Sequence, residues 1–335
     1  MNVPTKLCIV IVNYRTAKYV ADCLHSLSKE RELRTDWDVI IVDNASGDDS
    51  IFRLTRLIDI EEWGAWVQIY PQKHNGGFSY GNNAGIRIAL SSGKLPEHFM
   101  LLNPDTVVRP GALQALIEFL DAHSSAGIAG ALLENPDGSV DCSAHRMHSP
   151  IGEFEGAARL GILTRLLKKY IVSPPPEMLA HQCDWVSGAA MVFRRQVVED
   201  IGFMDEGFFL YFEEVDYCVR ARKSGWECWY VPESRIMHLE GAATGIRTVT
   251  RRRPAYWYDS RRRYFVKHYG VGGLLVSDVL WFLGRLSYLL RRSLGLGAQS
   301  QNIDPKWLMF DLLWGDLRAL VNGNVWRIVR ERRQP

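Results

Sequence analysis

The first 130 residues alternate between short apolar runs and segments with the apolar spacing of helices. The runs are rich in Val, Ile and Leu and lie at 7–12, 39–42, 67–70, 99–102 and 128–133. Helical spacing is found at 17–29, 48–60, 80–92 and 110–122. This alternation predicts an α/β fold with a Rossmann-like, mostly parallel sheet and helices on both faces.

Polar residues follow the first four apolar runs. In open α/β sheets, ligands bind beyond the carboxyl ends of the strands, so these residues are candidates for a binding site. No G-x-G-x-x-G follows the first run and no G-x-x-x-x-G-K-[ST] occurs, which excludes the common dinucleotide-binding and phosphate-loop folds. The residues are Asn13-Tyr14, Asp43-Asn44-Ala45-Ser46, Asn75-Gly76-Gly77-Phe78 and Asn103-Pro104-Asp105.

Charge is distributed unevenly along the chain. The net charge is +2, from 40 Lys and Arg against 38 Asp and Glu. Residues 1–250 carry 24 basic and 32 acidic residues, a net of −8, whereas 251–335 carry 16 and 6, a net of +10. An acidic domain needs a cation between itself and an anionic ligand such as a diphosphate. The six cysteines are scattered without metal-site spacing, and the first apolar run is too short for a signal peptide, so we expect a cytoplasmic protein.

Asp105 and His238 are candidate metal ligands. Asp105 follows a strand in a tight turn, and its carboxylate suits Mg²⁺ or Mn²⁺, while an imidazole shifts the preference toward the transition metal. The alternatives are that Asp105 caps the helix near 110 and that His238 is structural.

The second half contains a strand-like run at 185–193, a helical segment at 213–223 and a further strand at 226–231 that leads to His238. Glu213, Glu214 and Asp216 lie at the start of the helical segment. A carboxylate there could act as a general base toward a hydroxyl. The alternative is that these residues stabilise the helix dipole.

After residue 270 the composition becomes apolar and basic. Segment 271–290 carries Asp278 and Arg285 on one helical face, and each would cost about 2.5 to 3.5 kcal/mol at a bilayer centre, so we do not expect a span. This segment and 307–321 suit helices lying in a membrane interface, or a pair packed on the protein. The arginine runs 251–253 and 261–263 could bind nucleic acid, but the acidic body would repel a polyanion, so contacts to a diphosphate or lipid headgroups are favoured.

Motifs in this order resemble the family 2 glycosyltransferases of the GT-A fold, in particular the bacterial rhamnosyltransferase-like members. The resemblance spans residues 5 to about 270 and no single motif is specific. It rests on Ile11-Val12-Asn13-Tyr14, Val42-Asp43-Asn44-Ala45-Ser46, Asn75-Gly76-Gly77-Phe78, Asn82-Asn83-Ala84-Gly85, Leu102-Asn103-Pro104-Asp105, Trp185-Val186-Ser187-Gly188-Ala189, residues 202–222 and His238.

The resemblance implies roles for these residues. Asp43 would bind the pyrimidine base, and Asp105 and His238 would hold the metal, with Asn103 in place of the first acidic residue of the family motif. The catalytic base would be Glu214, where the family usually has aspartate. Nucleotide-sugar binding is implied for Asn13, Tyr14, Asp43, Asn44, Asn75, Gly77, Phe78, Asn82, Asn103 and Asp105, and an acceptor side for Trp185, Ser187, Gly188 and Glu213. An alternative for Trp185 is core packing.

These expectations combine into one hypothesis. The chain is expected to be a metal-dependent inverting glycosyltransferase that moves L-rhamnose from dTDP-L-rhamnose to a lipid-linked glycan, in the synthesis of a bacterial surface polysaccharide such as O-antigen. We expect it at the inner face of the cell membrane, bound peripherally through the C-terminal region, with no nucleic-acid partner and with homo-oligomers left open. The alternatives are a UDP-hexose or UDP-galactofuranose donor, or a non-catalytic membrane-associated subunit.

The expected domains follow the charge boundary. They are a GT-A catalytic domain at 1–250, with a nucleotide-sugar half at 1–130 and an acceptor half at 131–250, and a basic, helical, membrane-proximal extension at 251–335.

Overall fold

The computed structural model describes residues 6–93, 95–239, 252–296 and 304–332. The chain forms two compact units, each built from separate stretches of sequence. Residues 146–174 belong to the second unit, a grouping that differs from the expected boundary near 250; Arg251 lies outside the described residues. Unit 1 comprises Met1–His145, Pro175–Phe209 and Glu213–Gly245, and unit 2 comprises Arg146–Pro174, Leu210–Phe212 and Ile246–Pro335.

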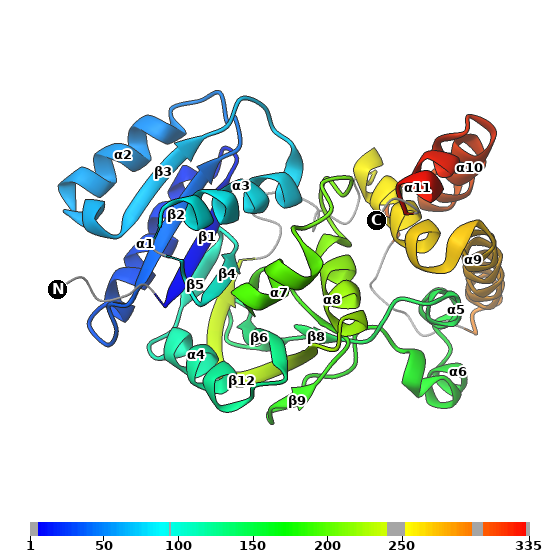
Figure 1. The fold of residues 1–335 in the computed structure, drawn as a ribbon. Coiled ribbons are helices and arrows are strands. Elements are labelled where there is room, and N and C mark those ends of the chain that lie inside the picture. Colours follow the sequence, from blue (N-terminus) through cyan, green and yellow to red (C-terminus); the bar gives the residue numbers. More distant parts are fainter. Residues whose placement is uncertain (1–5, 94, 240–251, 297–303, 333–335) are drawn as a thin grey trace. The chain divides into compact units, whose positions relative to one another are not determined.

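Unit 1 is organised around a ten-stranded sheet of order β3-β2-β1-β4-β11-β6-β12-β5, with β7 beside β6 and β9 beside β12 (Figure 1). Strands β1 to β4 pair in parallel, β11 runs antiparallel to its neighbours, and β6 and β12 pair in parallel. The strands are β1 (Leu7–Asn13), β2 (Trp37–Asp43), β3 (Val67–Pro71), β4 (His98–Leu102), β5 (Thr106–Val108), β6 (Ala126–Glu134), β7 (Val140–Asp141), β9 (His181–Gln182), β11 (Ala190–Arg194) and β12 (Glu227–His238), with β8 (Ala144–His145) and β10 (Trp185–Val186) in a separate two-stranded sheet.

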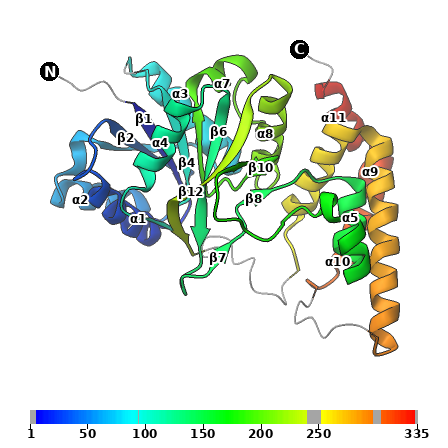
Figure 2. The same ribbon diagram turned by 90° about the horizontal axis from the view of Figure 1, so that it is seen from below.

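Helices cover both faces of the sheet of unit 1 (Figure 2). Residues such as Ile9 and Ile11 share a hydrophobic core with Leu24 of α1, Leu54 of α2 and Leu116 of α4, while α3 packs on β1 and β2. The helices are α1 (Ala17–Glu30), α2 (Ser50–Ile60), η1 (Trp63–Ala65), α3 (Gly77–Ser91), α4 (Ala112–Ala122), α7 (Arg195–Ile201) and α8 (Glu213–Lys223).

The five strands expected in the first half are all present, and the α/β prediction with helices on both faces is confirmed. The single strand expected at 185–193 is wrong. Residues Trp185–Val186 pair with β8, whereas Ala190–Arg194 form β11 of the main sheet. Ser187 to Ala189 form the break between them, with a turn at Gly188 and Ala189.

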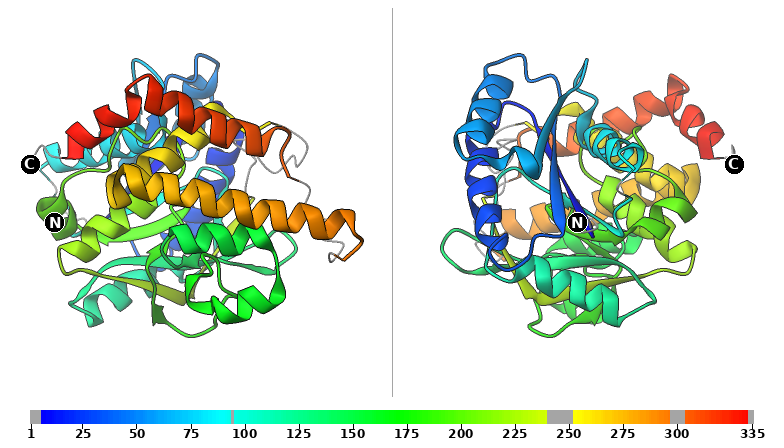
Figure 3. Two further views of the ribbon diagram at one scale, coloured as in Figure 1. Left: turned by 90° about the vertical axis from the view of Figure 1, so that its right-hand side faces the viewer. Right: turned by 60° about the vertical axis from the view of Figure 1, so that its left-hand side comes forward.

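Unit 2 is helical in its described residues. Its long helix α9 contains a kink at Gly270 (φ 74°, ψ 178°), and its C-terminal part lies along α5 (Figure 3). Helices α10 and α11 also pack on α9. The elements are α5 (Pro150–Ala158), α6 (Gly161–Leu166), η2 (Lys168–Tyr170), α9 (Ala255–Ser293), α10 (Leu308–Val321) and α11 (Asn324–Arg332).

Candidate active site

Every residue predicted for the site belongs to unit 1. At the ends of β1 and β2, the Asp43 carboxylate accepts hydrogen bonds from Asn13 Nδ2 (2.6 Å), Ser46 Oγ (2.6 Å) and Ser46 N (3.1 Å). Both Asp43 oxygens are therefore held by the protein itself, which fixes the two strand ends to each other. Tyr14 beside them is 40% exposed, with the Arg15 guanidinium 5.2 Å from its ring centroid.

Asn44 connects the end of β2 to the first turn of α3. Its Nδ2 donates to Asn75 Oδ1 (3.0 Å) and to the Gly77 carbonyl (2.9 Å), and Gly77 N also donates to Asn75 Oδ1 (3.0 Å). The Oδ1 atoms of Asn44 and Asn82 are buried without a partner among the described residues. Unpaired acceptors of this kind cost free energy unless a ligand donates to them.

The first turn of α3 lies directly against the chain that precedes α8. Phe78 N donates to the Phe209 carbonyl (2.7 Å). A Cβ on Gly77 would lie 2.0 Å from the same oxygen, and its φ is +86°, so glycine meets both a steric and a conformational requirement. This contact joins the predicted nucleotide pocket to the segment that carries the predicted base.

Asn83 was quoted in the motif but not predicted as a site residue, and it supports the same junction. It is buried; its Nδ2 donates to the Met204 carbonyl (2.8 Å) and to Glu206 Oε1 (2.9 Å), while its Oδ1 accepts from Met204 N (3.0 Å). The sequence offered one signal for Asn83. It is a second asparagine next to Asn82, at a buried position of α3 where a helix normally carries an apolar side chain.

Gly188 brings three distant motifs together. A Cβ at this position would lie 3.5 Å from Glu214 Cβ and 3.5 Å from Phe78 Cε1. The predicted nucleotide-lining Phe78, the acceptor-side Gly188 and the predicted base Glu214 are thus immediate neighbours, although they are far apart in sequence.

Glu213 and Glu214 are carboxylates without a countercharge among the described residues. Burial raises the pKa of Glu214 to about 7, and burial together with the neighbouring Glu214 charge raises the pKa of Glu213 well above its usual range. Neither residue has an arginine or lysine partner among the described residues, and the Oε2 atom of each has no hydrogen-bond donor there. Carboxyl groups with such pKa shifts cluster at functional sites.

The backbone before these glutamates is unusual. Tyr211 and Phe212 have positive φ values of 73° and 67°. Left-handed backbone in large residues costs about 1 to 3 kcal/mol each and is found mainly where function requires it. The first turn of α8 therefore follows directly after two residues in an unfavourable backbone conformation.

Asp105, His238 and Asn103 lie together, as the sequence predicted. Strand β5 pairs with β12 so that Thr106 faces His238, which brings His238 Nε2 to 3.3 Å from Asp105 Oδ1 and 3.3 Å from Asn103 Nδ2. Two ligand atoms at right angles on a metal, each at about 2.1 to 2.2 Å, would be about 3 Å apart. The carboxylate and imidazole therefore fit a divalent transition metal, although no group of three His, Cys, Asp or Glu side chains suited to a metal occurs among the described residues.

The acceptor-side residues are in more enclosed surroundings. Trp185 is buried, and one face of its ring stacks on His145 at a centroid distance of 3.9 Å. Ser187 N donates to the Ser143 carbonyl (3.0 Å), and Ser187 Oγ accepts from Ala189 N (3.3 Å). One face of Trp185 is thus occupied by His145, which agrees with the packing alternative for that face.

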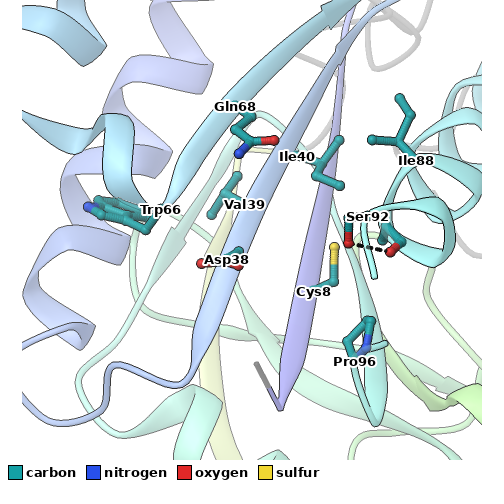
Figure 4. A pocket seen from close by; sticks show the side chains of 10 residues that line it. Cys8, Asp38, Val39, Ile40, Trp66, Gln68, Ile88, Ser92 and Pro96 are labelled. Carbon is teal, nitrogen blue, oxygen red and sulfur yellow. Dashed lines mark hydrogen bonds between the residues drawn. The ribbon is translucent and has the colours of Figure 1, made fainter. Parts of the chain in front are cut away.

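A small hollow lies at the opposite end of the strands. It is lined by residues such as Cys8 at the start of β1, Asp38 at the start of β2, and Ser92, whose hydroxyl donates to the Ala89 carbonyl (Figure 4). Asn13 and Asp43 lie at the other ends of the same strands, so this hollow is separate from the candidate site.

Comparison with known proteins identifies the family of the chain. The model of the glycosyltransferase like family 2 matches residues 4–260, and the chain belongs to that family. The chain is 28% identical over 253 residues to N-acetylglucosaminyl-diphospho-decaprenol L-rhamnosyltransferase of Mycobacterium tuberculosis, covering 71% of this chain and 78% of that protein. It is 24% identical to rhamnosyltransferase WbbL of Escherichia coli K12, covering 69% and 82%.

A solved structure supports the fold. The mannosyltransferase PcManGT from Pyrobaculum calidifontis, in complex with GDP-Man and Mn²⁺, superposes with a TM-score of 0.54 at 12% identity, covering 99% of this chain and 83% of that one. The expected GT-A architecture is thereby confirmed, and the chain is a glycosyltransferase of family 2.

Proposed function

We propose that the protein transfers a sugar with inversion, using Glu214 as the general base. The observation that carries this proposal is the juxtaposition at Gly188, where Glu214 and Phe78 approach the same small residue. A base next to the nucleotide pocket lies where an acceptor hydroxyl must meet the anomeric carbon. The pKa of about 7 lets Glu214 be ionised near neutral pH and still be basic enough to accept a proton.

In the proposed reaction, Glu214 takes the proton of an acceptor hydroxyl while the oxygen forms a bond to the anomeric carbon. The bond from that carbon to the diphosphate oxygen breaks, and the nucleoside diphosphate leaves with the electron pair. Asp105 and His238 would hold a divalent ion, Mg²⁺ or Mn²⁺, which supplies positive charge to the departing diphosphate. The Oδ1 atoms of Asn44 and Asn82, which have no partner in the described part of the chain, would accept hydrogen bonds from donor groups of the nucleotide sugar.

The favoured donor is dTDP-L-rhamnose. Its support is that two relatives, at 28% and 24% identity, are named rhamnosyltransferases. The name of the mycobacterial relative refers to a diphospho-decaprenol acceptor, which supports a lipid-linked glycan as the acceptor here. We accordingly propose a role in surface polysaccharide synthesis, at the inner face of the cell membrane.

Substitution of Glu214 tests the base. Glu214→Gln should lower turnover by about a hundredfold or more, while calorimetry still detects the nucleotide donor binding in the presence of Mn²⁺. Glu199→Gln, at an exposed position on α7, is the matched control and should keep the wild-type rate. A Glu214→Gln rate close to wild type would refute the assignment.

A panel of donors tests the proposed donor sugar, and a variant of Asp105 tests the proposed metal site. dTDP-, UDP- and GDP-sugars are compared with Mg²⁺ or Mn²⁺ by nucleotide release, and turnover with any of them excludes a non-catalytic subunit. A preference for a UDP-sugar would replace rhamnose without affecting the base. Asp105→Ala should abolish the metal-dependent part of donor binding, and unchanged affinity would contradict its role.

A further inference from the structure

The second half of α9 exposes an apolar stripe. Seven large aliphatic side chains on it are 38% to 56% exposed. At 100° per residue, they fall on one side of the helix, over a stretch about 24 Å long. They are Leu275, Val276, Val279, Leu283, Leu286, Leu289 and Leu290.

The charged residues of the same stretch face the interior of unit 2. Asp278 is 8% exposed and its Oδ1 lies 2.9 Å from Arg261 Nη1, while Arg285 is 4% exposed and pairs with Asp304. A helix packed on a soluble protein normally buries its apolar side and exposes its charges. Here the pattern is inverted, because water-facing positions are aliphatic and inward positions carry paired charges.

The arginine run that precedes the stripe explains how these charges are accommodated. Arg261 is almost completely buried and holds Glu153 (2.9 Å), Asp278 (2.9 Å) and Asp316 (3.3 Å), and Arg262 Nε lies 2.5 Å from Asp316 Oδ1. These two arginines are therefore structural, which corrects the expectation that this run contacts a diphosphate or headgroups. Ionisable groups that pair inside a helical bundle, with an apolar exterior, are typical of proteins in contact with lipid.

Helix α10 repeats the pattern. Asp316 faces inward, whereas Phe310, Trp314, Leu317 and Val321 are 47% to 78% exposed. Their spacing of four, three and four residues places them on one face of the helix. Trp307, next to this face, is also exposed, and tryptophan is favoured at the boundary between headgroups and acyl chains.

The charge of unit 2 indicates what covers this surface. Its sequence contains 22 Lys and Arg and 8 Asp and Glu, a net of +14. Arg292, Lys306, Arg318, Arg327 and Arg330 are exposed. Such a surface attracts anionic headgroups, whereas a second copy of unit 2 would carry the same net positive charge and be repelled.

We infer that the exposed faces of α9 and α10 insert into the interface of an anionic bilayer, with the helices lying in the membrane plane. Among the described residues, α9 is the helix long and apolar enough to cross a membrane by length and composition alone. Its other side is covered by α5, however, since a Cβ on Gly284 would lie 2.7 Å from the Phe154 carbonyl. A helix with one protein-covered side and one aliphatic side fits an interface. This inference does not depend on the proposed reaction.

Flotation of the full chain with vesicles tests the inference. The wild type should float with vesicles of phosphatidylcholine and phosphatidylglycerol (7:3), and less with pure phosphatidylcholine. Leu283→Asp together with Leu286→Asp should lower the bound fraction tenfold or more, because both changes fall on the exposed stripe. The control pair is Phe52→Asp with Ile60→Asp, which makes the same change at exposed positions of α2 in unit 1 and should float like wild type.

Three outcomes would overturn membrane binding through this surface, and a fourth would overturn the in-plane arrangement. The first is a wild type that stays with the soluble fraction in the presence of anionic vesicles, and the second is a stripe variant that floats like wild type. The third is a lipid-free wild type that is dimeric by sedimentation velocity while the stripe variant is monomeric, since the stripe would then be a protein interface. Circular dichroism shows whether each variant is folded. Release of the wild type from vesicles by alkaline carbonate supports the in-plane arrangement, and retention contradicts it.

Discussion

Two sets of carboxylates, one in each unit, have different charged partners. In unit 1, Glu213 and Glu214 have no cationic partner among the described residues, and their pKa values are raised. In unit 2, Glu153, Asp278 and Asp316 all contact Arg261. Burial without a cation raises the pKa of both glutamates in unit 1. In unit 2 the charge of Arg261 opposes burial: the pKa of Glu153 is lowered, whereas burial still raises the pKa of Asp278 to about 7 and raises that of Asp316.

This difference distinguishes carboxylates suited to chemistry from those that hold a structure together. A general base must change protonation during each turnover, which a strong ion pair would prevent. A structural carboxylate in a helical bundle has no such requirement and can stay in its ion pair. The net charge is −12 for unit 1 and +14 for unit 2. This contrast is larger than the −8 and +10 found on the two sides of residue 250.

The largest effect is expected on the paired side. Arg261→Met should lower the free energy of unfolding by about 3 to 5 kcal/mol, because three carboxylates lose their shared partner. Arg252→Met is the control, since the Arg252 and Asp311 pair is solvent-exposed on the arginine side and should contribute less than about 1 kcal/mol. Urea denaturation of both variants measures the difference, and equal losses would remove the distinction between the units.

Substitution of the unpaired Glu214 should raise the stability of the protein, whereas substitution of Arg261 should lower it. The folded state keeps Glu214 protonated up to about pH 7, whereas the unfolded chain ionises near pH 4.5, so this stabilisation is present below pH 4.5 and lost as the pH rises through 7. Glu214→Gln should therefore raise stability by up to about 3 kcal/mol at pH 8 and by nothing near pH 4.5. Melting curves at the two pH values test this, and a variant less stable than wild type at pH 8 would contradict it.

The pH dependence of kcat should follow the ionisation of Glu214. Since the base works only when ionised, kcat should fall about tenfold for each pH unit below 7, reaching about a hundredfold at pH 5. Glu199→Gln should keep this profile. A rate independent of pH between 5 and 8 would show that a different group, or no titrating base, limits the reaction.

The smallest expected effect concerns backbone contact within unit 1. Gly77→Ala should lower stability by about 2 kcal/mol more than Gly111→Ala, because both have a similar positive φ but only Gly77 would place its Cβ on the Phe209 carbonyl. The donor affinity of the Gly77 variant should fall as well. Equal losses of stability in the two variants would mean that the contact between α3 and the segment before α8 can adjust to a Cβ without a large loss of stability.

Local patterns in the sequence were sufficient for much of the fold. The apolar runs gave β1 to β4 and β6 within a few residues, and the acidic start at Glu213 marked the beginning of α8. The break at Ser187 to Ala189 was missed because both flanking pieces have strand composition, and only pairing with β8 or β4 distinguishes them. The association of residues 146–174 with α9 depends on contacts between distant segments, which no local pattern records.

The sequence predicted a set of candidate site residues but not their geometry. The motifs identified Phe78, Gly188 and Glu214, yet their proximity requires α3, the turn before β11 and α8 to be assembled. The arginine run was the main error among the charged groups. Arg261 and Arg262 were expected at a phosphate, because composition alone does not reveal carboxylates on other helices.

The discontinuous build of unit 2 has a practical consequence for engineering. Helix α5, encoded in the middle of the chain, packs on α9 from the C-terminal part, so the tail is not a detachable module. An enzyme shortened before α9 would keep Glu153 and the α5 surface around Ala157 but lose what covers them. A version with better solubility in water should therefore be sought by recoding the outward leucines of α9, and a chimera must exchange both stretches together.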